Sequence, residues 1–437
     1  MRDRMRKVLI ISYTWPPMGG VGFIRASKFA KYLPSYGWEP VILTVRPGLR
    51  GELPEEGSLQ GIRVHRTEYR DVVGEVRKAF AFKTRLAKDG PAAGHAEAGH
   101  NAGGNRVTSF IREIVTMPDD QIGWLKFAVE EGKRVMDEER IDLVFSTSPP
   151  ETAHLIARSL KRYRRTPWIA DMRDLWSDDH FRRRTLFKKL VLKTIEANVL
   201  KDADKIITVS EPWADKLRSS SLRDASRIEV IENGFDEEDF NGASYYGNNK
   251  FTITYSGKLH KDHQDIGQFL LVLKDLIEEG RIDRRMIEIK FHVLGYDRPD
   301  ITAAAESLGI GDVVKELGPV PYLESLRIQR SSDVLLFVQW RGEGDDGWYS
   351  GKLYDYIGSR RPILALARNG GIIEDLIRRT ASGTIAHDRE AIRSFLLRSY
   401  GEHLKNGRVA FGGDEAEIVK QSRKIRTAKL ASLFDSI

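Results

Sequence analysis

The stretch from Val8 to Val45, VLIISYTWPPMGGVGFIRASKFAKYLPSYGWEPVILTV, decides the fold class. Val8–Tyr13 is almost continuously apolar, as a parallel strand covered on both faces is. A glycine-rich turn then leads into a segment with apolar residues at helical spacing. This segment stops at Gly37, and Val41–Val45 is apolar again. Strand, glycine turn, helix and strand in this order predict a βαβ unit.

The same alternation continues along the chain. Further predicted strands are Leu143–Ser146, Trp168–Ala170, Lys205–Val209, Ile228–Ile231, Phe251–Tyr255, Ile287–Leu294, Val334–Val338 and Pro362–Ala367. Residues 233–250 are polar, rich in Gly and Asn, and lack periodicity, which is typical of an interdomain linker. We therefore expect an α/β protein with two doubly wound parallel-sheet domains, residues 1–232 and 251–412.

The composition excludes several classes of protein. The chain has 437 residues, of which 41% are hydrophobic and 30% charged, as in a globular protein with ample core. It has no cysteine, so disulfide scaffolds, cysteine-ligated zinc, iron–sulfur clusters and thiol nucleophiles are excluded. No stretch approaches 18 uncharged apolar residues, and the first apolar run is too short for a signal peptide, so we expect no spanning helix.

Positive charge is concentrated in one region. Residues 158–193 contain twelve Lys or Arg and four Asp, a net charge of +8 against +7 for the whole chain. Within and beyond this region, residues 181–200 interleave apolar and basic side chains, which favours a helix lying on anionic lipid. The alternative is a helix packed on its own sheet with a solvated basic face. Nucleic acid is not expected, because no aromatic-rich binding module accompanies the charge.

Residues 87–106 are rich in Ala, Gly and His and predict a mobile loop. The loop contains His95 and His100, but no partner motif for a metal lies beside them. We therefore expect no metal site.

Three glycine-containing turns are candidates for phosphate binding. Gly19 and Gly20 follow the first strand, where backbone N–H groups can approach a phosphate or sugar. Gly257 ends a predicted strand, so that Lys258 projects at the edge where open α/β sheets bind ligands. For both turns the alternative is a structural one: a purely geometric turn in the first case and a solvated charged loop in the second.

The third turn enters a helix at about Gly351. The helix start presents free amides to an anion. Asp355, one turn further, can accept hydrogen bonds from a vicinal diol such as a ribose; the alternative is a core-capping aspartate. In the first half, Asp171, Arg173 and Asp174 follow a strand and can orient a sugar or act on a hydroxyl proton. A structural Arg–Asp pair is the alternative there.

Six segments together resemble glycosyltransferase family 4, which has the GT-B fold, across essentially the whole chain. They are the first strand with PPMGG, ADKIITVSE (Ala203–Glu211), VIENGFDEEDF (Val230–Phe240), YSGKL (Tyr255–Leu259), SDVLLFV (Ser332–Val338) and GKLYDYIGSRRPILAL (Gly351–Leu366). Two further segments, MPDDQIGW (Met117–Trp124) and TSPPETAHLIA, resemble the branch that builds bacterial surface polysaccharides.

The resemblance implies a retaining, hexosyltransferase-type enzyme that needs neither metal nor cofactor. Its donor is a nucleotide-diphosphate sugar, of the UDP or GDP type, bound to the second domain. Its acceptor is a saccharide or polyprenyl-linked saccharide bound to the first domain, across a cleft. The resemblance further implies that residues 413–437 form a helix packing back on the first domain, with a hinge around Gly234. The expected location is the cytoplasm, peripherally on the inner face of the plasma membrane.

The resemblance also assigns residues to the donor site. Lys258 stands where the family has a phosphate-binding arginine; His263 stands at the family's next lysine by strict spacing, and Lys261 is two positions earlier. Asp355 stands at the ribose-binding glutamate. The remaining expected donor contacts are the first-domain glycines Gly19 and Gly20, the backbone at Gly257, the base-reading segment at Val320, and the helix start at Gly351, Lys352 and Leu353.

Two departures from the family pattern leave alternatives open. Gly347 stands where the family has a second glutamate, eight positions before Asp355. Asp171, Arg173 and Asp174 lie near the place of a sugar-contacting histidine, which is absent; they are the expected catalytic residues. A catalytically degenerate binding subunit, or a sugar-nucleotide epimerase or hydrolase, are the alternative functions.

Overall fold

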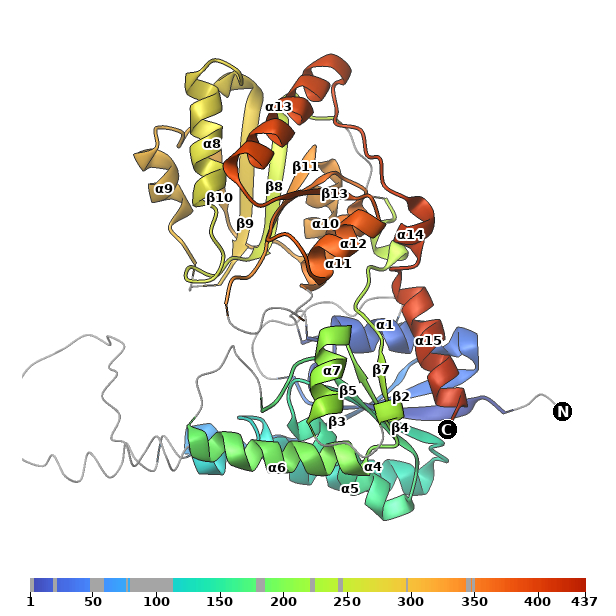
Figure 1. The fold of residues 1–437 in the computed structure, drawn as a ribbon. Helices are drawn as coiled ribbons and strands as arrows, with labels where there is room; N and C mark the ends of the chain where they lie inside the picture. The colour runs from blue at the N-terminus through green and yellow to red at the C-terminus, as the bar shows by residue number, and fades with distance from the viewer. Residues whose placement is uncertain are drawn as a thin grey trace, which may run out of the picture. The chain divides into compact units, whose positions relative to one another are not determined.

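The computed structural model describes residues 4–18, 22–47, 59–75, 78, 113–177, 185–220, 225–242, 247–295, 298–342, 347 and 350–437. The chain forms two compact units (Figure 1). Unit 1 consists of Met1–Ile231 together with Thr427–Ile437, and unit 2 consists of Glu232–Arg426. The loop expected at 87–106, with His95 and His100, lies outside the described residues.

Unit 1 is built on a seven-stranded parallel sheet in the order β3-β2-β1-β4-β5-β6-β7. Its strands are β1 (Arg6–Ile11), β2 (Trp38–Val45), β3 (Arg63–Thr67), β4 (Leu143–Ser148), β5 (Trp168–Met172), β6 (Lys205–Thr208) and β7 (Ile228–Val230). Its helices are α1 (Ile24–Tyr32), η1 (Leu33–Tyr36), η3 (Ile122–Trp124), α4 (Leu125–Glu138), α5 (Thr152–Arg164), α6 (Leu186–Asp202), α7 (Glu211–Ser219) and η4 (Ala225–Arg227).

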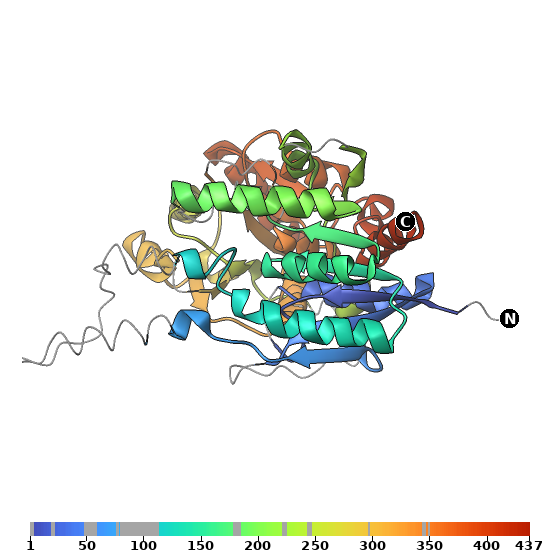
Figure 2. The ribbon, with the colours of Figure 1, turned by 90° about the horizontal axis from the view of Figure 1, so that it is seen from below.

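Both faces of this sheet are covered, which is why β1 is apolar without alternation. Val8 and Ile10 lie in a core formed with α1, whereas Leu9, which points to the other face, is equally buried. On that second face α4 and α5 pack side by side, with α6 beside α5 (Figure 2). The first helix ends as expected, since η1 stops at Gly37 in a left-handed conformation with φ +82°.

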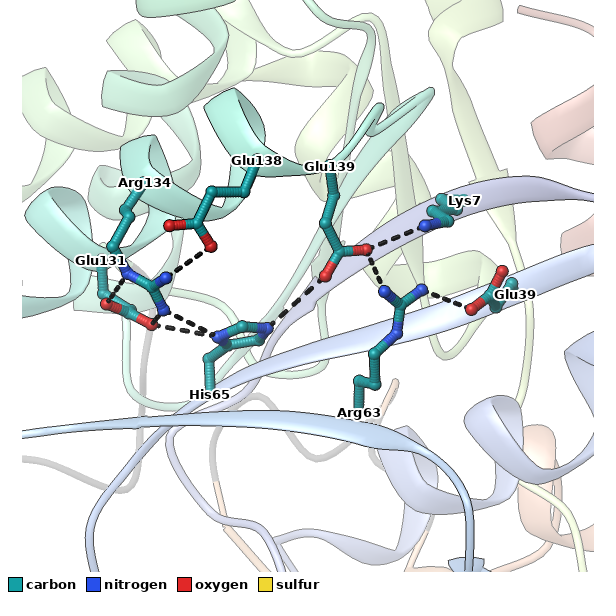
Figure 3. A network of polar contacts seen from close by, with 8 residues as sticks. All are labelled: Lys7, Glu39, Arg63, His65, Glu131, Arg134, Glu138 and Glu139. Atoms are coloured by element: carbon teal, nitrogen blue, oxygen red, sulfur yellow. Dashed lines mark hydrogen bonds and ion pairs between the residues drawn. The ribbon is translucent and has the colours of Figure 1, made fainter.

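The edge strand β3 is held to its neighbours by charged side chains (Figure 3). Its His65 contacts Glu131 of α4, with 3.0 Å between Nδ1 and Oε1. Glu139, just after α4, accepts from Lys7 of β1 at 2.9 Å and pairs with Arg63 of β3. Such surface pairs each contribute about 0–1 kcal/mol, so the network positions the edge strand more than it stabilises the fold.

Unit 2 is built on a six-stranded parallel sheet in the order β10-β9-β8-β11-β12-β13. Its strands are β8 (Phe251–Lys258), β9 (Ile287–Leu294), β10 (Val314–Leu317), β11 (Val334–Val338), β12 (Ile363–Leu366) and β13 (Gly383–Ala386). Its helices are η5 (Glu237–Phe240), α8 (Gly267–Glu278), η6 (Arg284–Met286), α9 (Ile301–Ser307), α10 (Tyr322–Ser331), α11 (Gly351–Ser359), α12 (Ile372–Arg379), α13 (Arg389–Asn406) and α14 (Glu415–Val419).

The helices of unit 2 cover both faces of its sheet (Figure 1). One core includes residues of α8, α9 and α13, and the other includes residues of α10, α11 and α12. The strand order reverses direction between β8 and β11, and the carboxyl ends of strands at such a switch point are where open α/β sheets bind ligands.

The last helix, α15 (Arg423–Asp435), belongs to both units. Leu430, Leu433 and Phe434 are buried in the unit 1 core. The stretch 413–437 is thus divided, because α14 lies in unit 2, where Ile418 joins the core of α10–α12.

The expected fold class is confirmed: the chain has two doubly wound parallel-sheet domains and C-terminal helices. Three strands, β3, β10 and β13, were not predicted from the sequence. All three are edge strands with one buried residue each, so their sequences lack a long apolar run.

Candidate functional site: the carboxyl edge of the unit 2 sheet

The centre of this edge is a contact between β8 and the start of α11. The Lys352 Nζ donates hydrogen bonds to the Tyr255 hydroxyl and, at 3.1 Å, to the carbonyl oxygen of Lys258. It also lies 4.1 Å from the centroid of the Tyr255 ring, a cation–π distance. Tyr255 is fully buried, and its own hydroxyl donates to the Lys258 carbonyl. The ammonium group of Lys352 is therefore held at the end of β8.

The side chain of Lys352 crosses Gly257 to reach this position. A Cβ built on Gly257 would lie 2.9 Å from the Lys352 Cε, closer than side-chain carbons approach. Gly257 also has a φ of +126°, which residues with a side chain rarely adopt. The glycine of the YSGKL segment is thus required by its backbone conformation, and the absence of a Cβ leaves room for the lysine side chain that covers it.

The surroundings of Lys352 disfavour its charged form. Burial lowers the pKa of Lys352 to about 7. The same burial raises the pKa of the Tyr255 hydroxyl well above its ordinary range, so the phenol stays protonated. An anion placed beside Lys352 would favour its charged form.

Asp355 lies one turn further along α11 and is half-buried. The Tyr322 hydroxyl, at the start of α10, donates to the Asp355 Oδ1 at 3.2 Å. Burial, together with the charge of Asp355, raises the pKa of Tyr322 well above its ordinary range, so Tyr322 remains a donor. Tyr322 therefore orients the carboxylate that the sequence singled out.

Buried hydrogen bonds join α11 to β8 and α10 beneath the site. The Tyr356 hydroxyl accepts from the backbone N–H of Ser256 at 2.9 Å. The Ser359 hydroxyl donates to the Gln329 side-chain oxygen at 3.1 Å, and the Gln329 amide donates to Ser325 at 2.9 Å. Such satisfied buried networks favour one arrangement of the elements over others, so the start of α11 is positioned firmly against β8.

The basic residues at the end of β8 and in the loop after it lie in different environments. Lys258 and Lys261 are exposed. The His263 ring stacks on Trp340, with centroids 4.0 Å apart and planes at 13°. Its Nδ1 lies 3.1 Å from the Arg341 carbonyl oxygen, so Nδ1–H donates there and Nε2 remains for another contact.

The other predicted donor residues are distributed as follows. Gly351 is exposed at the first position of α11. Leu353 has a fully buried side chain, and its amide donates to the Ser350 carbonyl at 3.0 Å, so neither group is directed to a ligand. Val320 is half-buried before α10, and Gly347 is buried.

In unit 1, Asp171 lies in a fully buried ion pair. Its carboxylate accepts from Arg25 of α1, with both distances 3.0 Å, and from the Thr147 hydroxyl at 2.7 Å. Arg25 in turn donates to the Ile231 carbonyl at 2.7 Å. This arrangement links α1, β4, β5 and the end of β7, which is the structural alternative raised from the sequence. A catalytic role for Asp171 stays a prediction.

The Arg173 side chain likewise forms hydrogen bonds within unit 1. Its guanidinium donates to the carbonyl oxygens of Ser148 and, at 2.9 Å, Gly22. Burial lowers the pKa of Arg173 below its ordinary range. Asp174 is half-buried. Arg173 thus holds the end of the first glycine turn against the end of β4, while Gly19 and Gly20 themselves lie outside the described residues.

An aromatic cluster, which the sequence reasoning did not identify, lies at the carboxyl edge of the unit 1 sheet. Tyr13 contacts Tyr69 and Trp124 edge-on, with ring centroids 6.2 and 5.3 Å apart. Tyr13 and Tyr69 are half-buried. Burial, with the nearby Tyr69 and Asp119, raises the pKa of Tyr13 to about 12. These rings offer apolar faces and hydroxyl donors together.

Metal-binding clusters and membrane-spanning helices are both absent from the described part of the chain. No three His, Asp or Glu side chains there lie close enough together to hold a metal ion. No helix among the same residues is both long enough and apolar enough to cross a bilayer.

Residues 24–234 match the family model described as "Glycosyl transferase 4-like domain". This match covers most of unit 1 and stops where unit 2 begins. No curated protein sequence matches the chain.

Solved structures with the same fold span the whole chain. Sucrose-phosphate synthase from Thermosynechococcus elongatus is similar with a TM-score of 0.62 at 13% identity, over 99% of this chain and 98% of that one. HepE from Anabaena, in complex with UDP and glucose, gives 0.60 at 13% identity, over 99% and 100%. The lipopolysaccharide outer core galactosyltransferase WaaB gives 0.55 at 13% identity, over 99% and 100%. The fold is therefore that of GT-B glycosyltransferases.

Tyr255, Tyr322 and Trp340 are the site residues that the sequence reasoning missed. Tyr255 directly precedes the Ser-Gly-Lys segment and Tyr322 lies two residues after Val320, so their positions were a usable signal. Trp340 follows a predicted strand by two residues, but nothing local indicates that it stacks on His263.

Proposed function

We propose that this protein is a retaining glycosyltransferase that moves a sugar from a nucleotide-diphosphate donor to a saccharide or polyprenyl-linked acceptor in surface-polysaccharide synthesis. The observation that carries the proposal is the group formed by Lys352, the start of α11 and Asp355 at the carboxyl edge of unit 2. The match of residues 24–234 to a glycosyl transferase 4-like domain supports it.

Each part of the donor has a suitable partner in this group. The diphosphate binds at the start of α11, where backbone N–H groups and the helix dipole favour anions. Lys352 and the exposed Lys258 add positive charge. The ribose hydroxyls bind Asp355, whose carboxylate is oriented by Tyr322. HepE and WaaB, which share the fold, are respectively a protein crystallised with UDP and glucose and a galactosyltransferase.

The chemical step needs charge stabilisation at the leaving group. The bond between the sugar C1 and the diphosphate oxygen breaks, an acceptor hydroxyl oxygen bonds to C1 on the same face, and the hydroxyl proton is released. Negative charge accumulates on the departing diphosphate. Lys352, already fixed against Tyr255, stabilises this charge with little reorganisation.

Unit 1 binds the acceptor in this proposal. Tyr13 and Tyr69 supply ring faces on which the apolar side of a sugar can stack, and hydroxyls that can bond to it. Tyr13→Ala is therefore expected to raise KM for the acceptor about tenfold while leaving nucleotide affinity unchanged.

The deciding experiment is a thermal-shift and calorimetry panel of UDP, GDP, dTDP, CMP and ADP. The wild type is compared with Lys352→Met, Asp355→Ala and the matched control Lys405→Met, which removes an exposed lysine on α13. One diphosphate should stabilise the wild type by about 2.7 kcal/mol at 100 times its Kd. The effect should be lost in the first two variants and kept in the control.

The product assay separates the alternatives. Donor with acceptor should give an α-linked product from an α-linked donor, observed by the anomeric signals in NMR. Inverted product would contradict the retaining mechanism. Free sugar or a new epimer from donor alone would favour a hydrolase or epimerase. Binding without turnover on any saccharide or polyprenyl-linked acceptor would favour the degenerate subunit suggested by Gly347.

A further inference from the structure

Asp119 is a buried carboxylate that the mechanism proposed above does not use. It belongs to Met117–Trp124, which precedes α4 and which we call the 117–124 segment, and it is 4% exposed. Its Oδ2 accepts a hydrogen bond from the backbone N–H of Thr152 at 2.7 Å. Its Oδ1 accepts from the Thr152 hydroxyl and from the backbone N–H of Gln121, at 2.8 Å each. Both carboxylate oxygens are thus bonded within unit 1.

The main partner of Asp119 is the start of a firmly packed helix. Thr152 is the first residue of α5, where backbone N–H groups lack partners within the helix and the helix dipole favours a negative charge. Ala153 and Ile156 of the same helix are fully buried. The carboxylate therefore joins the 117–124 segment to an element whose position is determined by the core of unit 1.

On its other side, the 117–124 segment contacts the residues that follow β3. The Tyr69 hydroxyl donates to the Asp120 carbonyl oxygen at 3.0 Å. The backbone N–H of Arg70 donates to the Gly123 carbonyl oxygen at 3.3 Å. The two stretches approach so closely that a Cβ built on Gly123 would lie 1.9 Å from the Arg70 carbonyl oxygen. The position of Tyr69 therefore depends on the backbone of the 117–124 segment.

Tyr13 lies against the end of the same segment. The Trp124 side chain is fully buried, and its indole N–H donates to the Thr67 hydroxyl at 2.8 Å. The Tyr13 ring contacts the Trp124 ring edge-on, with centroids 5.3 Å apart. Tyr13 and Tyr69 thus share one support, and Asp119 joins that support to α5.

We propose that Asp119 is a positioning residue of the acceptor site, which keeps the rings of Tyr13 and Tyr69 at the separation that a saccharide needs. Asp119 does not contact the saccharide, because it is buried and both of its oxygens are bonded within unit 1. Rings that are already fixed lose less conformational freedom on binding, so removal of their support should weaken saccharide binding. The inference rests on the proposed function, since it takes Tyr13 and Tyr69 as acceptor-binding residues.

The alternative is a carboxylate that only stabilises the fold. Asp204 provides a matched control, because it makes the same kind of bond at the opposite edge of the unit 1 sheet. Its Oδ2 accepts from the backbone N–H of Trp168, the first residue of β5, at 2.7 Å and pairs with Lys161 at 2.6 Å. Asp204→Ala should therefore destabilise unit 1 without moving Tyr13 or Tyr69.

The test measures saccharide binding to the full-length protein by saturation-transfer NMR, so that no turnover is needed. The probes are the octyl glycosides of glucose, galactose, mannose and N-acetylglucosamine, each below its micellar concentration. The variants are Asp119→Ala, Asp119→Asn and Asp204→Ala, the first of them also in a Tyr13→Ala background. Urea unfolding checks that each variant is folded, and hydrogen exchange of residues 67–72 reports on the support. The diphosphate thermal shift reports independently on the donor site.

Asp119→Ala should weaken glycoside binding about tenfold, as expected when two side chains must be immobilised on binding. Asp119→Asn should weaken it less, because the amide keeps one acceptor oxygen. Exchange of residues 67–72 should accelerate in Asp119→Ala, while the diphosphate shift keeps its wild-type value. Asp204→Ala should be less stable but bind glycosides as the wild type does. In the Tyr13→Ala background, Asp119→Ala should have a much smaller effect, because both substitutions act on the same rings.

Wild-type glycoside affinity in Asp119→Ala would overturn the inference. So would an equal loss in Asp204→Ala, or an undiminished effect of Asp119→Ala in the Tyr13→Ala background. If the wild type binds a diphosphate but no glycoside, the inference fails and the donor site of the proposed function stands. If it binds glycosides but no diphosphate, the proposed donor site fails, and the Asp119 variants still decide the inference.

Discussion

At the scale of single residues, Lys352 is the group whose properties depend most on its environment. A lysine at this position of an isolated helix would be solvated and charged. Here it covers Gly257, bonds to Tyr255 and has a pKa lowered to about 7 by burial. Near neutral pH it therefore exists in both protonation states, and an anionic ligand shifts it to the charged one.

Diphosphate binding at pH 8 is therefore expected to take up a proton, because Lys352 is mainly neutral before binding and charged after it. Affinity should fall as pH rises above about 7. Calorimetry in two buffers of different ionisation enthalpy measures the uptake. Lys352→Met should abolish it and Lys405→Met should retain it. Unchanged uptake in Lys352→Met would show that another group carries the proton.

The pKa of Lys352 should also make folding stability depend on pH, but stability should rise with pH where diphosphate affinity falls. The pKa of Lys352 is lower in the folded chain than the ordinary 10.5 of the unfolded one. The folded state thus binds fewer protons, and stability rises with pH from about 7 to 10.5. Below pH 7 the penalty for charging Lys352 is fully present. Urea unfolding of the wild type and Lys352→Met should show this slope only in the wild type.

Asp171 illustrates the opposite case, because its buried carboxylate is already paired with Arg25. Asp171→Ala is expected to destabilise unit 1 by about 3–5 kcal/mol, because it leaves Arg25 buried without its carboxylate partner. Urea unfolding followed by tryptophan fluorescence measures the change, and Arg25→Met/Asp171→Leu should recover part of it. Normal stability with lost turnover would instead indicate a catalytic Asp171.

At the scale of elements, the site depends on how α11 meets β8. A buried hydrogen bond joins Ser256 and Tyr356, which are 100 positions apart in the sequence. The Lys352 side chain crosses the last residues of the same strand. Neither element carries the site alone, since the helix supplies the amides and Asp355, whereas the strand supplies Tyr255 and the space above Gly257.

Gly257→Ala is expected to disturb this junction. The alanine would have to adopt the unfavourable φ of Gly257, and its methyl group would press on the Lys352 side chain. The strain corresponds to about 1–3 kcal/mol of stability, and displacement of Lys352 should weaken diphosphate binding about tenfold. Chemical unfolding and calorimetry measure the two effects. Gly401→Ala, at a helical glycine with open space around it, is the control: it should leave diphosphate binding unchanged and stabilise the fold by about 1 kcal/mol.

At the scale of the whole molecule, unit 1 is assembled from both ends of the chain. Phe434 of α15 contacts Trp38 and Phe145 of the N-terminal segment, with ring centroids 5.1 and 5.8 Å apart. Trp38 also donates to Asp435 at 2.9 Å. The core of unit 1 is thus completed by residues that follow unit 2 in the sequence.

Phe434→Ala should consequently destabilise unit 1 by about 3–5 kcal/mol, as large-to-small substitutions in a core do. Differential scanning calorimetry with and without diphosphate distinguishes the units, because only unit 2 is proposed to bind the ligand. The unit 1 transition should move and the ligand-dependent one should not. Ile425→Ala, at a position 40% exposed on the same helix, is the matched control. A shift of similar size in both variants would contradict this reasoning.

Much of the architecture was predictable because it depends on local patterns. The apolar runs of β1, β9 and β11 and the glycines that end elements are properties of neighbouring residues, and alternation of such segments implies parallel sheets. The candidate residues Lys258 and Asp355 were found in the same way, at a strand end and near a helix start, whereas Lys352 was assigned by the family resemblance. Edge strands such as β3, RVHRT, escaped because a half-exposed strand needs no apolar run.

What local patterns could not supply was the partner of each group. From the sequence alone Asp171 was suited either to catalysis or to an ion pair, and only the folded chain shows that Arg25, 146 positions away, lies against it. Nor does any local pattern indicate that Lys352 lies over Gly257 or that Phe434 completes the core around Trp38. Protonation, burial and hydrogen bonding depend on distances across the folded chain, and those distances arise from packing rather than from sequence neighbourhood.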